Sequence, residues 1–183
     1  MLGRLELDAS DPKFIPLEKR MAEVIAGSEP DGAVDLLAFA SRCYDTERFA
    51  MSVRFYELTF QVQPNIVDDQ NTQHRYNAAC CASLATANPL SSDPPLNDSD
   101  TTRLRGQARL WLQAELDAWK GLLDGGAQQN RAKIASTLAH WQQDSDLAAI
   151  RDSQSLDKLP EPERQEWQTF WKQVADAHQR ASE

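Results

Sequence analysis

The chain has 183 residues and a formal net charge of −9 at pH 7, because 28 acidic residues outnumber 19 lysines and arginines. Hydrophobic residues make up 41% and charged residues 26%, which is typical of a globular protein with one buried core. Binding to nucleic acid or to an anionic membrane surface is disfavoured, because both need clustered basic residues. No apolar run reaches the length of a membrane span, and the N-terminus lacks the pattern of a signal peptide. We therefore expect a cytoplasmic protein without membrane insertion.

The N-terminal part of the chain predicts an arm and two helices. We expect residues 1–15 to form an irregular N-terminal arm. A first helix, which Gly27 would stop, is predicted by one apolar stripe at helical spacing: Leu17, Met21, Val24 and Ile25. A second helix is predicted by a further stripe, formed by Val34, Leu37, Ser41 and Tyr44.

Residues 36–64 match the spacing of a tetratricopeptide repeat (TPR), a helix–turn–helix unit of about 34 residues. The matching positions read Leu36-x2-Phe39-Ala40-x2-Cys43, then Ser52-x3-Tyr56, then Pro64. Ala40 and Ser52 are small enough to let the two helices approach closely, and Pro64 would end the second one. The spacing therefore predicts a closely packed helical hairpin.

The second helix of that hairpin, at about Thr46–Gln63, carries two apolar stripes instead of one. The first stripe consists of Phe49, Val53, Tyr56 and Phe60, and the second of Met51, Phe55, Leu58 and Val62. A helix at the surface has a single apolar face, so two stripes predict burial on both sides. This is the situation of a helix between neighbours in a stacked solenoid.

The middle of the chain predicts a helix at Arg75–Ala87 and then an acidic loop, rich in proline and serine, at 88–100. We expect this loop to be mobile and dispensable for the fold, because its composition offers little apolar surface to bury. The next helix is predicted to be capped near Asp100 or Thr101 and to end at Gly125-Gly126. Its buried face would consist of Leu104, Ala108, Trp111, Leu112, Trp119, Leu122 and Leu123.

The C-terminal part predicts a helix at Asn130–Gln143, a short turn at Leu147–Arg151 and a final helix that starts at Pro160. The final helix has an apolar stripe of Trp167, Phe170, Trp171 and Val174. All five tryptophans of the chain occupy such stripes, so we expect core packing and not an exposed aromatic platform. Residues 1–183 are thus predicted to form one all-α domain of about seven helices, with TPR-like hairpins stacked as a short right-handed solenoid.

Residues with catalytic or metal-binding potential form no recognisable motif. Cys43, Cys80 and Cys81 cannot supply a paired disulfide framework, and we expect them to fill tight helix contacts. The spacing from His74 to Cys80 does not match a structural zinc site. His140 has no serine, cysteine or aspartate at a spacing that identifies a catalytic triad. We predict no catalytic residue, no metal and no cofactor.

Four segments occur in an order that resembles a known family. They are R-Y-N-A-A-C at Arg75–Cys80, R-x2-A-x2-W-L at Arg105–Leu112, H-W-Q-Q-D-S-D-L-A-A-I-R-D at His140–Asp152, and L-P-E-P-E-R-Q-E-W-Q-T-F-W at Leu159–Trp171. Over about Leu36–Ala177 the chain resembles the C-terminal TPR-like region of bacterial eukaryotic-like serine/threonine protein kinases. The resemblance implies a region that follows a kinase domain and binds proteins. The chain contains no Gly-rich phosphate loop, H-R-D loop or D-F-G motif, so we expect no phosphoryl transfer.

Two functions remain open. The first is a non-catalytic protein–protein interaction module, whose first helices receive a peptide or a partner helix that carries Lys or Arg. The residues expected to contact the partner are Leu37, Ser41, Tyr44, Asp45, Tyr76, Cys80 and Ser83. The alternative is a small helical regulatory or ligand-sensing domain, which requires a pocket with convergent polar groups.

Overall fold

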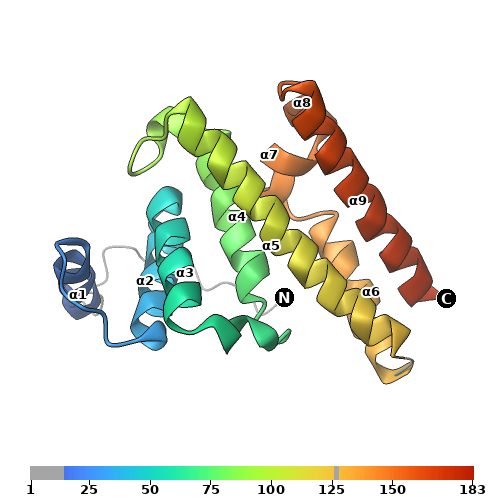
Figure 1. Ribbon diagram of the computed structural model, residues 1–183, viewed down its shortest axis with the longest axis horizontal. Helices are drawn as coiled ribbons and strands as arrows, with labels where there is room; N and C mark the ends of the chain where they lie inside the picture. The colour runs from blue at the N-terminus through green and yellow to red at the C-terminus, as the bar shows by residue number, and fades with distance from the viewer. Residues whose placement is uncertain (1–14, 126–127) are drawn as a thin grey trace.

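The computed structural model describes residues 15–125 and 128–183, and every regular element in these ranges is helical (Figure 1). The expected N-terminal arm, 1–15, lies outside the described residues apart from Ile15. The α-helices are α1 (Ile15–Ile25), α2 (Ala33–Asp45), α3 (Phe49–Val62), α4 (His74–Ala87), α5 (Asp98–Asp124), α6 (Gln128–Trp141), α7 (Ala148–Arg151), α8 (Ser153–Leu156) and α9 (Glu161–Ser182). Within the described ranges, three short 3-10 helices accompany them: η2 (Pro64–Asp68), η3 (Pro89–Ser91) and η4 (Ser145–Leu147). The all-α prediction is confirmed for the described ranges, where no helix has the length and apolar character needed to cross a bilayer.

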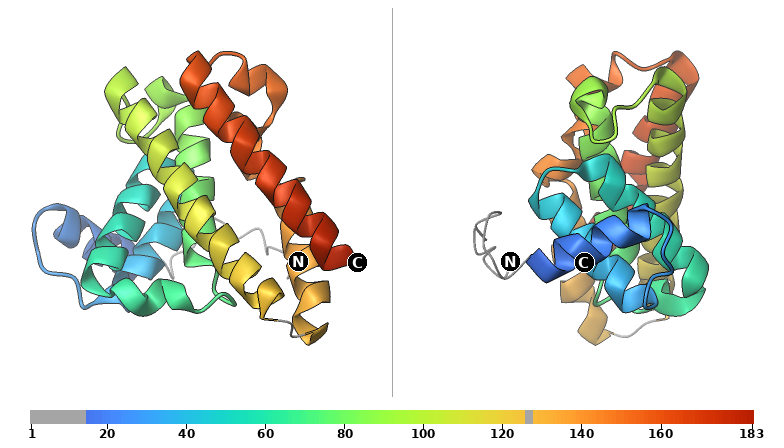
Figure 2. Two further views of the ribbon diagram at one scale, coloured as in Figure 1. Left: turned by 45° about the vertical axis from the view of Figure 1, so that its right-hand side comes forward. Right: turned by 90° about the vertical axis from the view of Figure 1, so that its left-hand side faces the viewer.

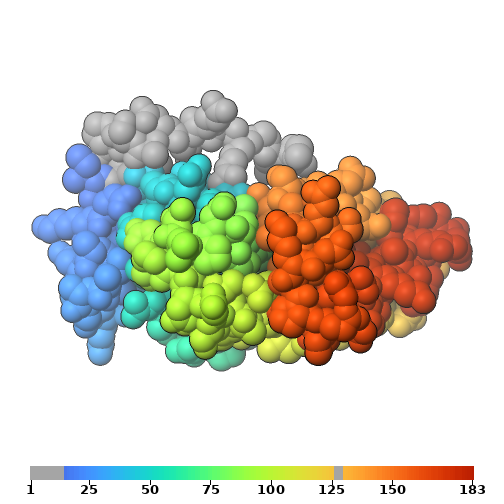
Figure 3. All heavy atoms as spheres, turned by 90° about the horizontal axis from the view of Figure 1, so that it is seen from above, coloured from blue at the N-terminus to red at the C-terminus, as the bar shows by residue number. Residues whose placement is uncertain are grey.

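The long helices lie in two layers. In Figure 1, and in the left-hand view of Figure 2, α3, α5 and α9 lie in front of α2, α4 and α6. Each front helix contacts mainly one helix behind it, in the pairs α2–α3, α4–α5 and α6–α9. In addition, α3 contacts α4, and α5 contacts α6. The space-filling view in Figure 3 shows the elements following one another along the long axis, from α1 at one end to α9 at the other. More α-helices are present than the seven or so expected, because α7 and α8 are short helices within the connection from α6 to α9.

The pair α2–α3 confirms the close approach that the repeat spacing predicts. Ala40 and Ser52 are fully buried, and the Ser52 hydroxyl donates a hydrogen bond to the Ala40 carbonyl at 2.8 Å. Phe39 and Phe55 contact each other across the same interface, with ring centroids 5.3 Å apart. Helix α3 ends one residue before Gln63, and Pro64 begins η2, as expected for a residue that cannot continue an α-helix.

The stripe predicted for the second helix is wrong at two of its four positions, whereas Leu37 and Tyr44 are half-buried against the core. Val34 is 80% exposed and Ser41 is exposed. The buried residues of α2 are Ala33, Leu36, Phe39, Ala40, Arg42 and Cys43, which include the positions of the repeat spacing. Phe39 and Ala40 contact α3, while Arg42 and Cys43 contact α1, so these residues are buried between two neighbouring helices.

Helix α3 is buried on two sides, because it contacts both α2 and α4. Val53, Phe55 and Tyr56 from both predicted stripes are buried, which confirms the double-stripe argument for the middle of the helix. The argument does not hold at the C-terminal end, where Val62 is 55% exposed.

The segment between α4 and α5 is attached to the core more firmly than its composition suggested. Leu96 is only 9% exposed and belongs to the hydrophobic core, whereas Leu90 is 86% exposed. The Met51 amide donates to the Asp93 carbonyl at 3.2 Å, and Arg48 Nε pairs with Asp93 Oδ2 at 2.9 Å. Helix α5 begins earlier than predicted, because the Asn97 side chain caps it by accepting the Asp100 amide at 2.9 Å.

The remaining helices bury most of the residues predicted for them. Trp111, Trp119, Trp141 and Trp167 are buried and Trp171 is half-buried, which confirms core packing of the tryptophans. The prediction for Leu122 is wrong, since 37% of this side chain is exposed near the end of α5. Pro160 is the N-cap of α9 and not its first helical residue, a difference of one position.

Candidate functional site

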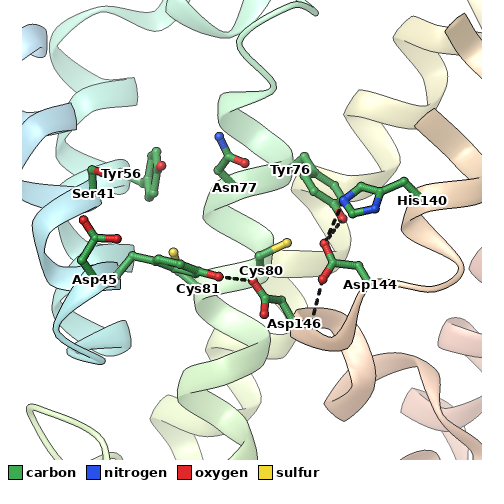
Figure 4. A pocket seen from close by; sticks show the side chains of 11 residues that line it. Ser41, Asp45, Tyr56, Tyr76, Asn77, Cys80, Cys81, His140, Asp144 and Asp146 are labelled. Atoms are coloured by element: carbon green, nitrogen blue, oxygen red, sulfur yellow. Dashed lines mark hydrogen bonds and ion pairs between the residues drawn. The ribbon is translucent and has the colours of Figure 1, made fainter. Parts of the chain in front are cut away.

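One pocket of about 570 Å³ lies where α2, α3 and α4 meet the end of α6 and the turn that follows it (Figure 4). The lining residues are Ser41, Tyr44 and Asp45 from α2, Tyr56 from α3, Tyr76, Asn77, Cys80 and Cys81 from α4, His140 from α6, and Asp144 and Asp146 from the turn. The pocket therefore combines segments that are about a hundred residues apart in the sequence. Helix α4 lies between its two sides, as Figure 4 shows.

Two tyrosine–aspartate pairs are the main polar contacts of the pocket. The Tyr76 hydroxyl donates to Asp144 Oδ2 at 2.5 Å, and the Tyr44 hydroxyl donates to Asp146 Oδ2. The ring of Tyr76 is stacked on Trp141, with centroids 5.1 Å apart and planes 14° apart. Burial and the nearby Cys80 and Asp144 raise the pKa of Tyr76, so its hydroxyl stays protonated and acts as a donor. These pairs tie α2 and α4 to the turn after α6.

The turn that carries both aspartates is held by its own backbone contacts. Asp144 caps η4, because its Oδ1 accepts the Asp146 amide at 3.0 Å. Arg151 Nη1 donates to the Asp144 carbonyl at 2.5 Å and lies 3.4 Å from the Trp141 carbonyl. The two carboxylates are therefore fixed before any ligand arrives.

His140 lies beside the first of these acids. Its Nε2 is 3.2 Å from Asp144 Oδ2, and 47% of the side chain is exposed. The contact becomes an ion pair when the imidazole is protonated. Figure 4 shows Tyr76 and His140 converging on Asp144 from neighbouring helices.

The two cysteines of the pocket have the character of buried thiols. Cys80 is 4% exposed, and burial raises its pKa well above the usual value, with Asp144 acting in the same direction. Burial also raises the pKa of Cys81 to about 12, although a hydrogen bond with Ser52 acts against this. A nucleophilic cysteine needs a lowered pKa, usually from a neighbouring cation. The grouping of Cys80, His140 and Asp144 therefore contains the residue types of a cysteine hydrolase without an activated thiol.

Metal ligation is the other chemistry that these residue types allow. Cys80, Asp144 and Asp146 each place one ligand atom within 4.8 Å of the others. A metal ion would have to displace the thiol proton of Cys80, which burial retains. It would also compete with the tyrosine hydroxyls that already donate to both carboxylates. The contacts present are those of an acidic, hydrogen-bonded pocket.

Apart from His140, the ionisable acid and base groups on the described pocket lining are carboxylates, cysteine thiols and tyrosine hydroxyls. Asp45, Asp144 and Asp146 contribute carboxylates, and no lysine or arginine occurs among the described residues that line the pocket. Carboxylates that share a confined space focus a negative potential, which attracts cations and repels anions. The pocket is thus suited to a positively charged group.

Seven residues were expected to contact a partner, and five of them line this pocket: Ser41, Tyr44, Asp45, Tyr76 and Cys80. The other two lie elsewhere. Leu37 is half-buried and packs against the core, and Ser83 is fully buried. Leu37 lies four positions before Ser41 and Ser83 lies three positions after Cys80, so each shares a helix face with a lining residue but lies about one turn away, outside the pocket lining.

Sequence reasoning missed Asp144 and Asp146, the acids that pair with the tyrosines. They lie outside the repeat spacing, and no local pattern links them to residues in α2 and α4. The available signal was the short D-S-D sequence directly after the apolar face of α6, where a carboxylate can cap the next turn. His140 was considered as a base, but its aspartate partner at i+4 was not identified.

Comparison of this chain with protein-family profiles, with curated proteins and with solved structures gives no match. The arguments about function that follow therefore depend on the sequence and on the geometry of the pocket.

Proposed function

We propose that this protein is a non-catalytic protein–protein interaction module that binds a peptide or a helix of a partner in the pocket described above. The observation that carries the proposal is the position of the pocket. Its lining comes mainly from α2 and α4, which are the first helices of two successive helix pairs. His140 at the end of α6, the first helix of the third pair, and two acids from the turn after it complete the lining. First helices form the binding surface of TPR arrays.

The proposed architecture is TPR-like. The pairs α2–α3 and α4–α5 are consecutive, and the first has the small-residue contact that the repeat spacing requires. The third pair, α6–α9, departs from a regular repeat because η4, α7 and α8 intervene. We regard the assembly as a short solenoid of two TPR-like hairpins followed by one modified hairpin.

The family resemblance supports the same site. Two of the four segments that carry it, Arg75–Cys80 and His140–Asp152, supply Tyr76, Asn77, Cys80, His140, Asp144 and Asp146 to the pocket. We therefore propose that the module belongs to a bacterial signalling protein of the serine/threonine kinase class, where it holds a partner and transfers no phosphoryl group. Incubation of the purified chain with radiolabelled ATP and a protein substrate would reject this view if phosphate were incorporated.

A selection from a random peptide library displayed on phage, with the purified chain as bait, tests the binding proposal. We expect the selection to enrich peptides that bind the parent chain. These peptides should bind the Ser41→Trp variant at least about tenfold more weakly, because an indole at this exposed position would fill the pocket. Leu110→Trp is the matched control, since Leu110 is 59% exposed on α5 in the other layer. Both variants should melt as the parent does. The proposal fails if no peptide is enriched, or if both variants bind equally well.

Two further substitutions locate the binding site on α2. We expect Tyr44→Ala and Asp45→Lys to weaken peptide binding, because both side chains line the pocket. Tyr44 also donates to Asp146 and contacts the Phe49 ring at 5.7 Å, so Tyr44→Phe is added to separate the hydroxyl from the ring. Peptide binding that is unaffected by all three variants would place the site elsewhere.

The convergence of buried polar groups in the pocket favours one second candidate, a small ligand-sensing domain. Tyr76 and Cys80 are buried titratable groups, and the pKa of each is raised. A thermal-shift screen of small metabolites tests this alternative. A compound that stabilises the parent but not Ser41→Trp, in the absence of any peptide ligand, would favour ligand sensing.

A further inference from the structure

We propose that the pocket selects its partner by binding one arginine side chain, which enters between the tyrosines and pairs with Asp144 and Asp146. This inference rests on the proposed function, and it adds the chemistry of the partner residue.

Charge is the first reason. Asp144 and Asp146 both line the pocket, and the described lining contains no lysine or arginine. Its basic side chain is His140, which lies 3.2 Å from Asp144 Oδ2 and carries a charge only when protonated. Asp144 is only 14% exposed, so its charge is screened less than a surface charge would be. An incoming cation therefore gains more at this position than on the open surface.

The acceptor capacity of the two acids is the second reason. Asp144 accepts the Tyr76 hydroxyl at Oδ2, where His140 Nε2 also lies at 3.2 Å, and it accepts the Asp146 amide at Oδ1. Asp146 accepts the Tyr44 hydroxyl. A carboxylate can accept about four hydrogen bonds, so both acids retain capacity for N–H donors. One oxygen of each acid lies within 4.8 Å of the other, a separation that the donors of a single guanidinium can bridge.

The aromatic walls favour arginine over lysine. Tyr44, Tyr56 and Tyr76 all line the pocket, and Trp141 supports the Tyr76 ring from one side. A guanidinium is planar and stacks on aromatic rings while its edge donates to carboxylates, whereas an ammonium is a compact and strongly hydrated charge.

Pre-organisation is the final reason. The capping bond within η4 and the contacts of Arg151 hold both acids in place. A ligand that finds its acceptors already ordered loses less free energy on binding. Ser41 and Asn77 are exposed on the lining, where they can donate to or accept from the backbone of the segment that carries the arginine.

The first arm of the test uses capped arginine, N-acetyl-arginine N-methylamide, as the probe. Titration into the ¹⁵N-labelled full chain should give saturable shifts at the amides of Asn77, His140 and Asp146. The citrulline counterpart has nearly the same shape without the charge, and we expect its binding to be at least about tenfold weaker. Equal binding of the two probes, or no binding of capped arginine, would overturn the inference.

Variants of the acids provide the second readout. Asp144→Asn removes the charge and keeps one acceptor oxygen, which can still cap the Asp146 amide, while its Nδ2 group can donate to the Tyr76 hydroxyl oxygen. The variant should abolish the preference for arginine over citrulline. Asp146→Asn repeats the experiment at a second acid, in case one variant unfolds. Asp117→Asn on α5 is the matched control for the change in net charge, because Asp117 is 57% exposed and lies outside the pocket. A preference that survives both pocket variants would contradict the inference.

The second arm uses the peptides selected on phage, so that the two proposals can fail separately. Peptides that bind in the pocket but tolerate replacement of every arginine would leave the interaction function standing and overturn the arginine site. Capped arginine that binds when no peptide is enriched would support the arginine site and overturn the interaction function. Peptides that contain arginine should also bind at least about tenfold more tightly than capped arginine. Equal affinity would show that the arginine bound in the pocket does not come from a segment of a partner protein.

Discussion

The helix pairs α2–α3 and α6–α9 both pack two helices side by side, but their helices are connected in different ways. A short turn at residues 46–48 joins α2 to α3, and Ala40 and Ser52 allow close contact. The pair α6–α9 is separated by a connection at residues 142–160, which contains η4, α7 and α8. The first pair follows a repeat spacing that is visible in the sequence, whereas the second is completed by residues far along the chain.

The difference shows where the chemistry of this protein originates. The turn after α6 belongs to neither helix of its pair, and it supplies the two acids that pair with Tyr44 and Tyr76. Helix α4 stands between the two pairs and contacts α3, η4 and α7. The first pair therefore provides a wall of the pocket and much of the buried core, while the connection of the second pair provides the charge.

The largest effect is expected from the core of the first pair. Phe55→Ala removes a side chain that is 2% exposed and contacts Phe39, so it should lower the free energy of unfolding by about 3–5 kcal/mol. Chemical denaturation followed by circular dichroism measures the change. Arg54→Ala, at an exposed neighbouring position, should have little effect. Melting of Phe55→Ala within a degree or two of the parent would show that α3 is not the centre of this core.

The reactivity of the buried cysteines tests whether alkylating reagents can enter the region between the two helix pairs. The pKa of Cys43 and that of Cys81 are each raised to about 12, so at pH 8.5 their thiolate fraction falls on the order of a thousandfold below that of a free thiol. Because the pKa is raised, alkylation by iodoacetamide should keep accelerating as the pH rises above 9. Mass spectrometry of native and denatured protein measures the rates. Rapid labelling of Cys80 in the native chain would contradict the assignment of an inert thiol.

The loop between α4 and α5 offers a matched pair of leucines. Leu96→Ala should lower the free energy of unfolding by about 2–3 kcal/mol, because this side chain is in the core, whereas Leu90→Ala should change it by less than about 0.5 kcal/mol. Thermal unfolding of the two variants makes the comparison. Equal melting temperatures would support the expectation from composition that this loop is dispensable.

A smaller effect is expected from the connection of the second pair. Arg151→Ala removes the donor to the carbonyls of Trp141 and Asp144, and it should cost about 1–2 kcal/mol. Arg103→Ala, at a side chain that is 54% exposed, is the control. If the turn is held in the way described, Arg151→Ala should also weaken binding of capped arginine. An unchanged affinity would show that the acids keep their positions without Arg151.

Much of the fold could be predicted because the signals for it are local. The position of α1, the repeat spacing of α2 and α3 and the tryptophan positions of α5 and α9 each depend on residues within a few turns of one another. In the α1 stripe Met21 is buried, but Ile25 is 40% exposed. The errors arose where two local patterns competed, as in α2, or where composition concealed a single apolar residue, as at Leu96. In both cases contact with a distant element decided the outcome.

The sequence by itself determined the helical class, the first hairpin and the side of α2 and α4 on which Ser41, Tyr44 and Tyr76 lie, because helical periodicity follows directly from residue order. Only the tertiary structure decided which groups those side chains meet. Tyr44 and Asp146 are far apart in the chain, and their pairing depends on the packing of α4 against η4 and α7. No local spacing encodes such a contact, because it results from how whole helices pack against one another.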